Sequence, residues 1–105
     1  MSTDPEGRLR VLYAEFTARP GSEDEVASLL GALAVRVRAE PGCVVFSPHR
    51  LTERPAAFFV YEVYRDEAAF QDHISAPYGL EFNQRLQPLI VEDGSQLTWL
   101  RPLHN

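Results

Sequence analysis

The stretch from residue 58 to residue 82 holds the side chains of this sequence that are best suited to proton transfer. Glu62 lies in the apolar run FFVYEVY, His73 ends the helical pattern DEAAFQDH, and Tyr78 follows five residues later. Histidine titrates near neutral pH, and a partly buried carboxylate can orient it or accept a proton itself. We therefore predict that these three side chains converge on one pocket, with His73 as the catalytic base and Glu62 as its partner.

Both predicted catalytic residues also have a purely structural interpretation. His73 sits at the border of an apolar helix stripe, where its ring could simply hydrogen-bond to a backbone carbonyl group. Glu62 needs a partner because an unpaired buried carboxylate is costly. An ion pair with Arg50 or Arg85 would meet that need without any catalysis.

Other residues have types that could contact a ligand. Tyr64, Tyr78 and Trp99 could provide a flat aromatic lining with polar tips, as a planar phenolic ligand would require. His49 and Arg50, next to a proline in an apolar segment, form a further candidate pair for substrate binding. We expect the bound substrate to be a small aromatic molecule.

Several kinds of site lack the residues that they need. Cys43 is the only cysteine, so no internal disulfide can form, and its place at the start of an apolar run favours a packed residue over a nucleophile. The three histidines are dispersed, and we expect no role for His104 near the terminus. No HxxE or Cys/His grouping indicates a metal site, and no GxGxxG or phosphate-binding loop indicates a nucleotide or flavin. We therefore predict that the protein uses no cofactor.

Length and composition indicate one globular domain. Of the 105 residues, 45% are hydrophobic and 24% charged, so we expect a flexible tail over residues 1–7 and a single domain over 8–105. The net charge of −5, with 10 basic side chains that are all arginines, disfavours nucleic acid and anionic membranes as partners. No apolar run approaches the ~20 residues that span a bilayer. We expect a cytoplasmic protein.

Apolar periodicity and turn residues predict the order β-α-β-β-α-β. The expected strands cover residues 8–18, 43–51, 57–64 and 96–103, with helices starting at Ser22 and Asp66. Ser22 and Glu25 have the spacing of a capping box, and Pro41-Gly42 should end the first helix. A break at residues 75–77 should divide the second helix. Pro48 cannot donate to a strand ladder, which favours an edge position or a bulge for its strand.

Two halves of similar length, joined at residues 52–55, form the ferredoxin-like split βαβ pattern of an α+β protein. Its expected form is a four-stranded antiparallel sheet with the helices on one face. The strand over residues 57–64 is apolar or aromatic at both odd and even positions, yet helices can cover only one face of the sheet. We therefore predict that a second copy covers the other face and that the protein is a homodimer.

Three stretches, FFVYEVYRDEAAFQDHISAPYGLEF, RPGSEDEVASLL and EPGC, resemble the antibiotic biosynthesis monooxygenase (ABM) family, which includes quinol monooxygenases and autoinducer-2 isomerases. The resemblance extends over residues 8–103. It implies a dimeric α+β barrel whose two sheets pack face to face. It also supports His73 as a site residue, because a histidine at this place in a DEAAFQDH-like helix is common in the family.

The resemblance implies a cofactor-independent monooxygenase that oxidises a small aromatic quinol or polyketide-like phenol with O2. Heme-degrading relatives carry a tryptophan near the place of His73 and an iron-ligating histidine about one helical segment later. Residues 82–84 of this sequence read Phe-Asn-Gln there, which argues against heme.

Two other functions remain open on the same scaffold. An isomerase acting on a small, possibly phosphorylated, carbonyl compound would need a cation such as Arg50 or Arg85 near His73. A dimeric ligand-binding module without catalysis would be favoured if His73 bonded only to the backbone and Glu62 lay elsewhere. A flat aromatic pocket would favour the quinol reaction.

Overall fold

The computed structural model describes residues 8–103, so the expected tail over residues 1–7 and His104 lie outside the described residues. The strands are β1 (Arg10–Thr17), β2 (Cys43–Arg50), β3 (Ala57–Tyr64) and β4 (Gln96–Leu100). The helices are α1 (Glu23–Arg38), α2 (Glu67–Ser75) and α3 (Pro77–Leu86), followed by the 3-10 turn η1 (Gln87–Leu89). This order confirms the predicted β-α-β-β-α-β pattern, with its second helix divided in two.

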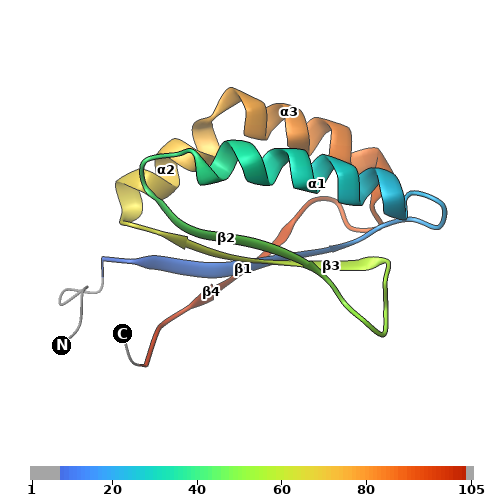
Figure 1. The fold of residues 1–105 in the computed structure, drawn as a ribbon, viewed down its shortest axis with the longest axis horizontal. Helices are drawn as coiled ribbons and strands as arrows, with labels where there is room; N and C mark the ends of the chain where they lie inside the picture. The colour runs from blue at the N-terminus through green and yellow to red at the C-terminus, as the bar shows by residue number, and fades with distance from the viewer. Residues whose placement is uncertain (1–7, 104–105) are drawn as a thin grey trace.

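The strands form one antiparallel sheet in the order β2-β3-β1-β4. All helices lie on one face of this sheet (Figure 1), which confirms the ferredoxin-like α+β fold. β2 is an edge strand, as Pro48 predicted, and a bulge lies between Cys43 and Val45. β4 is the other edge and ends at Leu100, earlier than the predicted strand over residues 96–103.

The two helix starts differ in how they are capped. Asp66 accepts a hydrogen bond from the Ala69 amide (2.8 Å) and caps α2 as predicted. The capping box at Ser22 was wrong, because the Ser22 side chain makes no capping bond and its backbone (φ −102°, ψ 2°) lacks the extended conformation of a capping residue. Instead, the Gly21 amide donates to the side chain of Glu23 (2.9 Å). Gly21 has φ 90°, a value that glycine adopts without strain.

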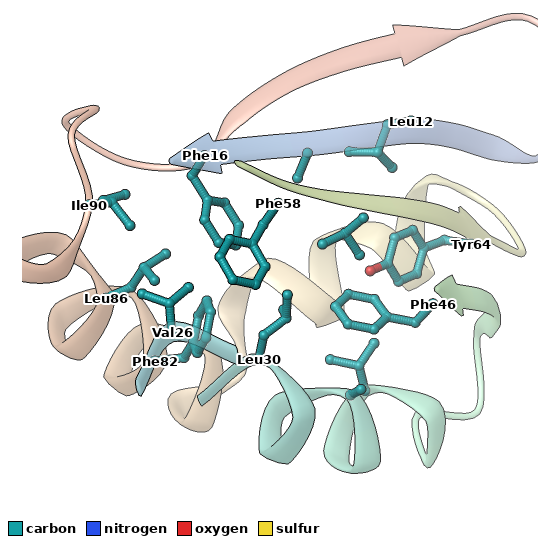
Figure 2. Close-up of a cluster of buried hydrophobic side chains, with 14 of the residues drawn as sticks. Leu12, Phe16, Val26, Leu30, Phe46, Phe58, Tyr64, Phe82, Leu86 and Ile90 are labelled. Carbon is teal, nitrogen blue, oxygen red and sulfur yellow. The ribbon is translucent and has the colours of Figure 1, made fainter. Parts of the chain in front are cut away.

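The core lies between the sheet and the helices (Figure 2). Side chains alternate along β1 and β3, so one set of residues faces the helices, including Leu12, Phe16 and Phe58. The rings of Phe16 and Phe58 stack across the two strands with centroids 5.8 Å apart. Burying a large apolar side chain contributes roughly 1.5–3 kcal/mol, so this layer holds the helices onto the sheet.

The sheet face opposite the helices is also apolar. The alternate residues of β1 and β3 point there, and Tyr13 stacks on Phe59 with ring centroids 4.8 Å apart. Tyr61, next along β3, is 36% exposed. No helix among the described residues covers this face (Figure 1). The chain therefore presents an aromatic surface on a strand that also forms the core.

Candidate active site

β3 places Glu62 on the helix-facing side of the sheet, between Val60 and Tyr64 on the same face. Its side chain is the one charged group within residues 8–103 that is buried, with 6% of the residue exposed. Tyr64 donates a hydrogen bond to Glu62 Oε1 over 2.6 Å. This neutral donor partly compensates for the lost hydration of the carboxylate.

α2 brings His73 to Glu62. His73 lies in the last turn of this helix, with its ring against that of Tyr64 (centroids 4.7 Å apart). Its Nε2 lies 3.8 Å from Glu62 Oε1, which is ion-pair distance but longer than a hydrogen bond. The His73 side chain is 16% exposed. A strand and a helix thus place the predicted base beside its predicted carboxylate.

A second carboxylate, which the sequence analysis did not select, lies on the other side of the ring. Glu40, in the turn between α1 and β2, has Oε2 3.2 Å from His73 Nδ1. The same oxygen accepts a hydrogen bond from the Tyr78 hydroxyl. One signal could have identified Glu40: it is an acid just after the end of α1, where the helix dipole disfavours negative charge. His73 therefore lies between two carboxylates.

The burial of these groups changes their acidity. Burial raises the pKa of Glu62, although the hydrogen bond from Tyr64 and the charge of His73 act in the opposite direction. Burial and the neighbouring Glu62 also raise the pKa of Tyr64, so Tyr64 remains a protonated donor. For Tyr78, burial and the bond to Glu40 raise the pKa. Both phenols are held as donors to carboxylates.

A cavity of about 340 Å³ extends between the sheet and the helices and has Glu62 and His73 in its wall. This volume is sufficient for a one- or two-ring organic molecule. The aromatic side chains of the wall are Phe16, Phe46, Phe70 and Phe82. Figure 2 shows Phe46 at one end of the buried cluster and Leu86 and Ile90 at the other, and all three line the cavity.

Polar groups on the cavity wall are few. Besides Glu62 and His73, they come from α3, from η1 and from the turn before β4: Asn83, Gln87, Asp93 and Ser95. The ionisable side chains of the wall are thus two acids and one histidine. A wall of this composition favours a mostly apolar ligand and would repel an anionic one.

The structure does not place the three predicted aromatic ligand contacts on the cavity wall. Tyr64 is fully buried behind Glu62, and Tyr78 points to Glu40. Trp99, on β4, packs edge-on against Phe70 with centroids 4.8 Å apart, and the Arg10 guanidinium lies over its ring. Tyr64 therefore touches the candidate site through Glu62 and the His73 ring, and Tyr78 touches it through Glu40, whereas Trp99 packs behind a wall residue.

His49 and Arg50 lie at the exposed end of β2 and are not part of the cavity wall. His49 Nδ1 is 2.9 Å from the carbonyl oxygen of Ser47, and Arg50 donates to the carbonyl oxygen of Pro55 (2.8 Å). Cys43 is half-buried, and burial raises the pKa of its thiol. Among the described residues, none of the three forms a hydrogen bond or an ion pair with His73.

Within residues 8–103, no set of three or more histidine, cysteine or acidic side chains has the arrangement of a metal site. Over the same residues, no helix combines the length and the apolar character that crossing a membrane requires.

The fold and the cavity define a small ferredoxin-like domain that encloses a ligand-sized space beside a histidine and two carboxylates. The chain belongs to the antibiotic biosynthesis monooxygenase family, whose sequence model matches residues 10–85. The matched residues include all three stretches that resemble the family.

Similar proteins come from several bacteria. The chain is 26% identical over 92 residues to "Putative monooxygenase Rv0793" of Mycobacterium tuberculosis, covering 88% of this chain and 89% of that protein. It is 27% identical over 82 residues to the uncharacterized protein sll1783 of Synechocystis. This match covers 78% of this chain but only 56% of sll1783. The chain thus spans little more than half the length of that relative.

Solved structures share the fold over almost the whole chain. PA3566 of Pseudomonas aeruginosa superposes with a TM-score of 0.84 at 28% identity, covering 91% of this chain and 95% of that one. The structure of Rv0793 superposes with a TM-score of 0.84 at 25% identity, covering 92% of this chain and 97% of that one.

Proposed function

We propose that the protein is a cofactor-independent monooxygenase that oxidises a small aromatic quinol or phenol with O2. The observation that carries this proposal is the position of His73 on the wall of an apolar, phenylalanine-lined cavity, with a carboxylate on each side of its ring. An apolar wall suits a flat aromatic ring, and the polar end of the cavity suits its hydroxyl group. Family membership and relatives named as monooxygenases support the same reaction class.

In the proposed reaction, Nε2 of His73 accepts the proton of the substrate hydroxyl group. Glu62, 3.8 Å away, then stabilises the imidazolium that forms. The electron-rich anion reacts with O2 to form a carbon–oxygen bond, and the resulting peroxide loses water. For a simple hydroquinone, one oxygen atom enters the ring and the other leaves as water. The quinol supplies all the electrons, so the product is a hydroxyquinone and no further reductant is required.

The features of the site favour this proposal over the two alternatives. An isomerase of a phosphorylated compound needs a cation at its anionic group, whereas the ionisable groups of the cavity wall are Glu62, His73 and Asp93. A simple binding module would be favoured by a His73 bonded only to the backbone. The ring instead lies beside Glu40 and Glu62.

We further propose that the protein functions as a homodimer in the cytoplasm. The aromatic face formed by Tyr13, Phe59 and Tyr61 would be covered by the same face of a second copy. The single free Cys43 is in keeping with a reducing compartment.

Oxygen consumption by the purified protein, freed of metal and flavin, would test the reaction with a panel of hydroquinones, naphthohydroquinones and anthrone-like phenols. Loss of a general base lowers rates by ~10²- to 10⁴-fold, so we expect His73→Ala to reduce turnover by that amount. Asp72→Ala, an exposed neighbour on α2, is the matched control and should retain full turnover. Absence of turnover by the wild type over the panel would contradict the proposed reaction. Unchanged turnover in His73→Ala would exclude His73 as the base.

A further inference from the structure

Glu40 occupies a position that the fold itself does not favour. It follows the C-terminal end of α1, where the partial negative charge of the helix dipole repels a carboxylate. The two arginines in the last turn of α1 have other contacts: Arg38 donates to the carbonyl oxygen of Phe46, and Arg36 lies over the ring of Tyr78. The side chain of Glu40, only 17% exposed, is directed instead at His73 and Tyr78.

The two distances around the imidazole ring differ in kind. Nδ1 of His73 is 3.2 Å from Glu40 Oε2, which is hydrogen-bond distance, whereas Nε2 is 3.8 Å from Glu62 Oε1. In a neutral imidazole only one nitrogen carries hydrogen, and the partner of that nitrogen determines which one it is. The shorter contact favours a hydrogen on Nδ1, an arrangement in which the lone pair of Nε2 lies on the side of Glu62.

Neither Glu40 nor Tyr78 lines the cavity, whereas His73 and Glu62 do. Tyr78 donates to the same oxygen of Glu40 that faces His73, and the Arg36 guanidinium, 4.5 Å from the ring centroid, holds Tyr78 from the outside. Glu40 is thus fixed from two directions on the side of His73 that is remote from a bound ligand.

We propose that Glu40 is the positioning residue of this site: it holds the Nδ1 hydrogen of His73, so that Nε2 presents its lone pair to the cavity, and Tyr78 holds Glu40 in place. Tyr78 then acts through Glu40 and not through the substrate. Glu62 is left to stabilise the charge that develops on the ring. The consequence for catalysis rests on the proposed function, whereas the consequence for the state of the ring does not.

Nitrogen-15 NMR of the histidine-labelled protein tests the state of the ring directly, without any substrate. At a pH where the ring is neutral, we expect the wild-type His73 to carry its hydrogen on Nδ1. In Glu40→Ala the hydrogen should move toward Nε2, and in Glu40→Asp, which retains the carboxylate, Nδ1 should recover part of it. Glu53→Ala, which removes an exposed acid from a turn, is the control and should leave the spectrum of His73 unchanged.

A wild-type ring with its hydrogen on Nε2 would overturn the proposal, whether or not the variants fold. So would an unchanged tautomer in a folded Glu40→Ala. If a quinol that is turned over has been found, Glu40→Ala should lower kcat by up to the ~10²- to 10⁴-fold that base catalysis contributes, with little change in KM. Absence of turnover by the wild type would contradict the proposed function alone, because the NMR result stands independently of it.

Discussion

Tyr64 donates its hydroxyl hydrogen to Glu62, two residues earlier on the same strand, over 2.6 Å. Residues two apart on a strand share a face, so β3 supplies both the buried charge and a donor for it. Within residues 8–103, the partners of this buried carboxylate are Tyr64 and His73, and no arginine forms an ion pair with it. Burial disfavours the charged form of the carboxyl group, and it therefore raises the pKa of Glu62.

We expect Glu62→Gln to stabilise the protein at pH 8. Because the pKa of Glu62 is raised in the folded state, wild-type stability declines as the pH rises from the unfolded carboxyl value of ~4.3 through the folded pKa. A neutral amide does not have this cost and can still accept the bond from Tyr64. Urea unfolding at several pH values should show the advantage of the variant shrinking toward pH 4. An advantage that is independent of pH would contradict this origin.

Glu92 should behave in the opposite way. Burial alone would raise its pKa, but hydrogen bonds from the Thr17 amide (2.7 Å) and the Thr17 hydroxyl (2.9 Å) outweigh burial and lower the pKa of Glu92. The stabilisation is therefore present above the unfolded pKa of ~4.3 and is lost as the pH falls through the folded pKa. We expect Glu92→Gln to cost about 1 kcal/mol at neutral pH. Urea unfolding over the same pH values should show this destabilisation disappearing at acid pH. A destabilisation that persists at acid pH would show that the substitution disturbs side-chain packing.

Gly42→Ala should destabilise the junction between β2 and α2. A methyl group at Gly42 would collide with the Cβ of Ala69, and the carbonyl oxygen of Gly42 is already held by the Arg65 amide (2.8 Å). Overpacking of this kind costs roughly 1–3 kcal/mol, measurable by urea or thermal unfolding. Gly31→Ala is the control, because no described atom outside its chain neighbours and its own helix backbone lies within 4 Å of the added methyl group. Unchanged stability of Gly42→Ala relative to the wild type would show that α2 shifts to accommodate the methyl group.

Tyr61→Arg should shift the protein from dimer to monomer. The side chain lies on the sheet face opposite the helices, where a second copy is proposed to pack, and an arginine pair across a two-fold axis would be repelled. Sedimentation at micromolar concentration should detect the change. Leu80→Arg places the same charge on an exposed position of α3 and should remain dimeric. A monomeric wild type would contradict the proposed dimer itself.

Most of the fold was predictable because its signals are local. Pro41-Gly42 lies in the turn that follows α1, Pro77 begins α3, and Pro48 on an edge strand follows from the missing amide hydrogen. The capping box at Ser22 failed because spacing alone does not report the backbone angles of the capping residue. Residue types allow such a box, but the path of the preceding turn decides whether it forms.

The candidate site was only partly predictable. Glu62 was conspicuous as the one charge in an apolar strand, and His73 as a histidine on a helix border. Glu40 was hidden in a turn whose role depends on contacts 33 and 38 residues away along the chain, with His73 and Tyr78. The aromatic wall was missed for a different reason. Phenylalanines that line a cavity have the same periodicity as phenylalanines that fill a core.

Among the described residues, the cavity takes its wall from all four strands, from α1, α2, α3 and η1, and from the turn before β4. An occupant would therefore touch most of the fold at once and would bind the unfolded chain hardly at all. By thermodynamic linkage, a ligand at 100 times its Kd adds about 2.7 kcal/mol to the free energy of unfolding. The melting temperature of this domain should therefore rise when a ligand binds. A compound library can be ranked by the size of this increase before any reaction is known.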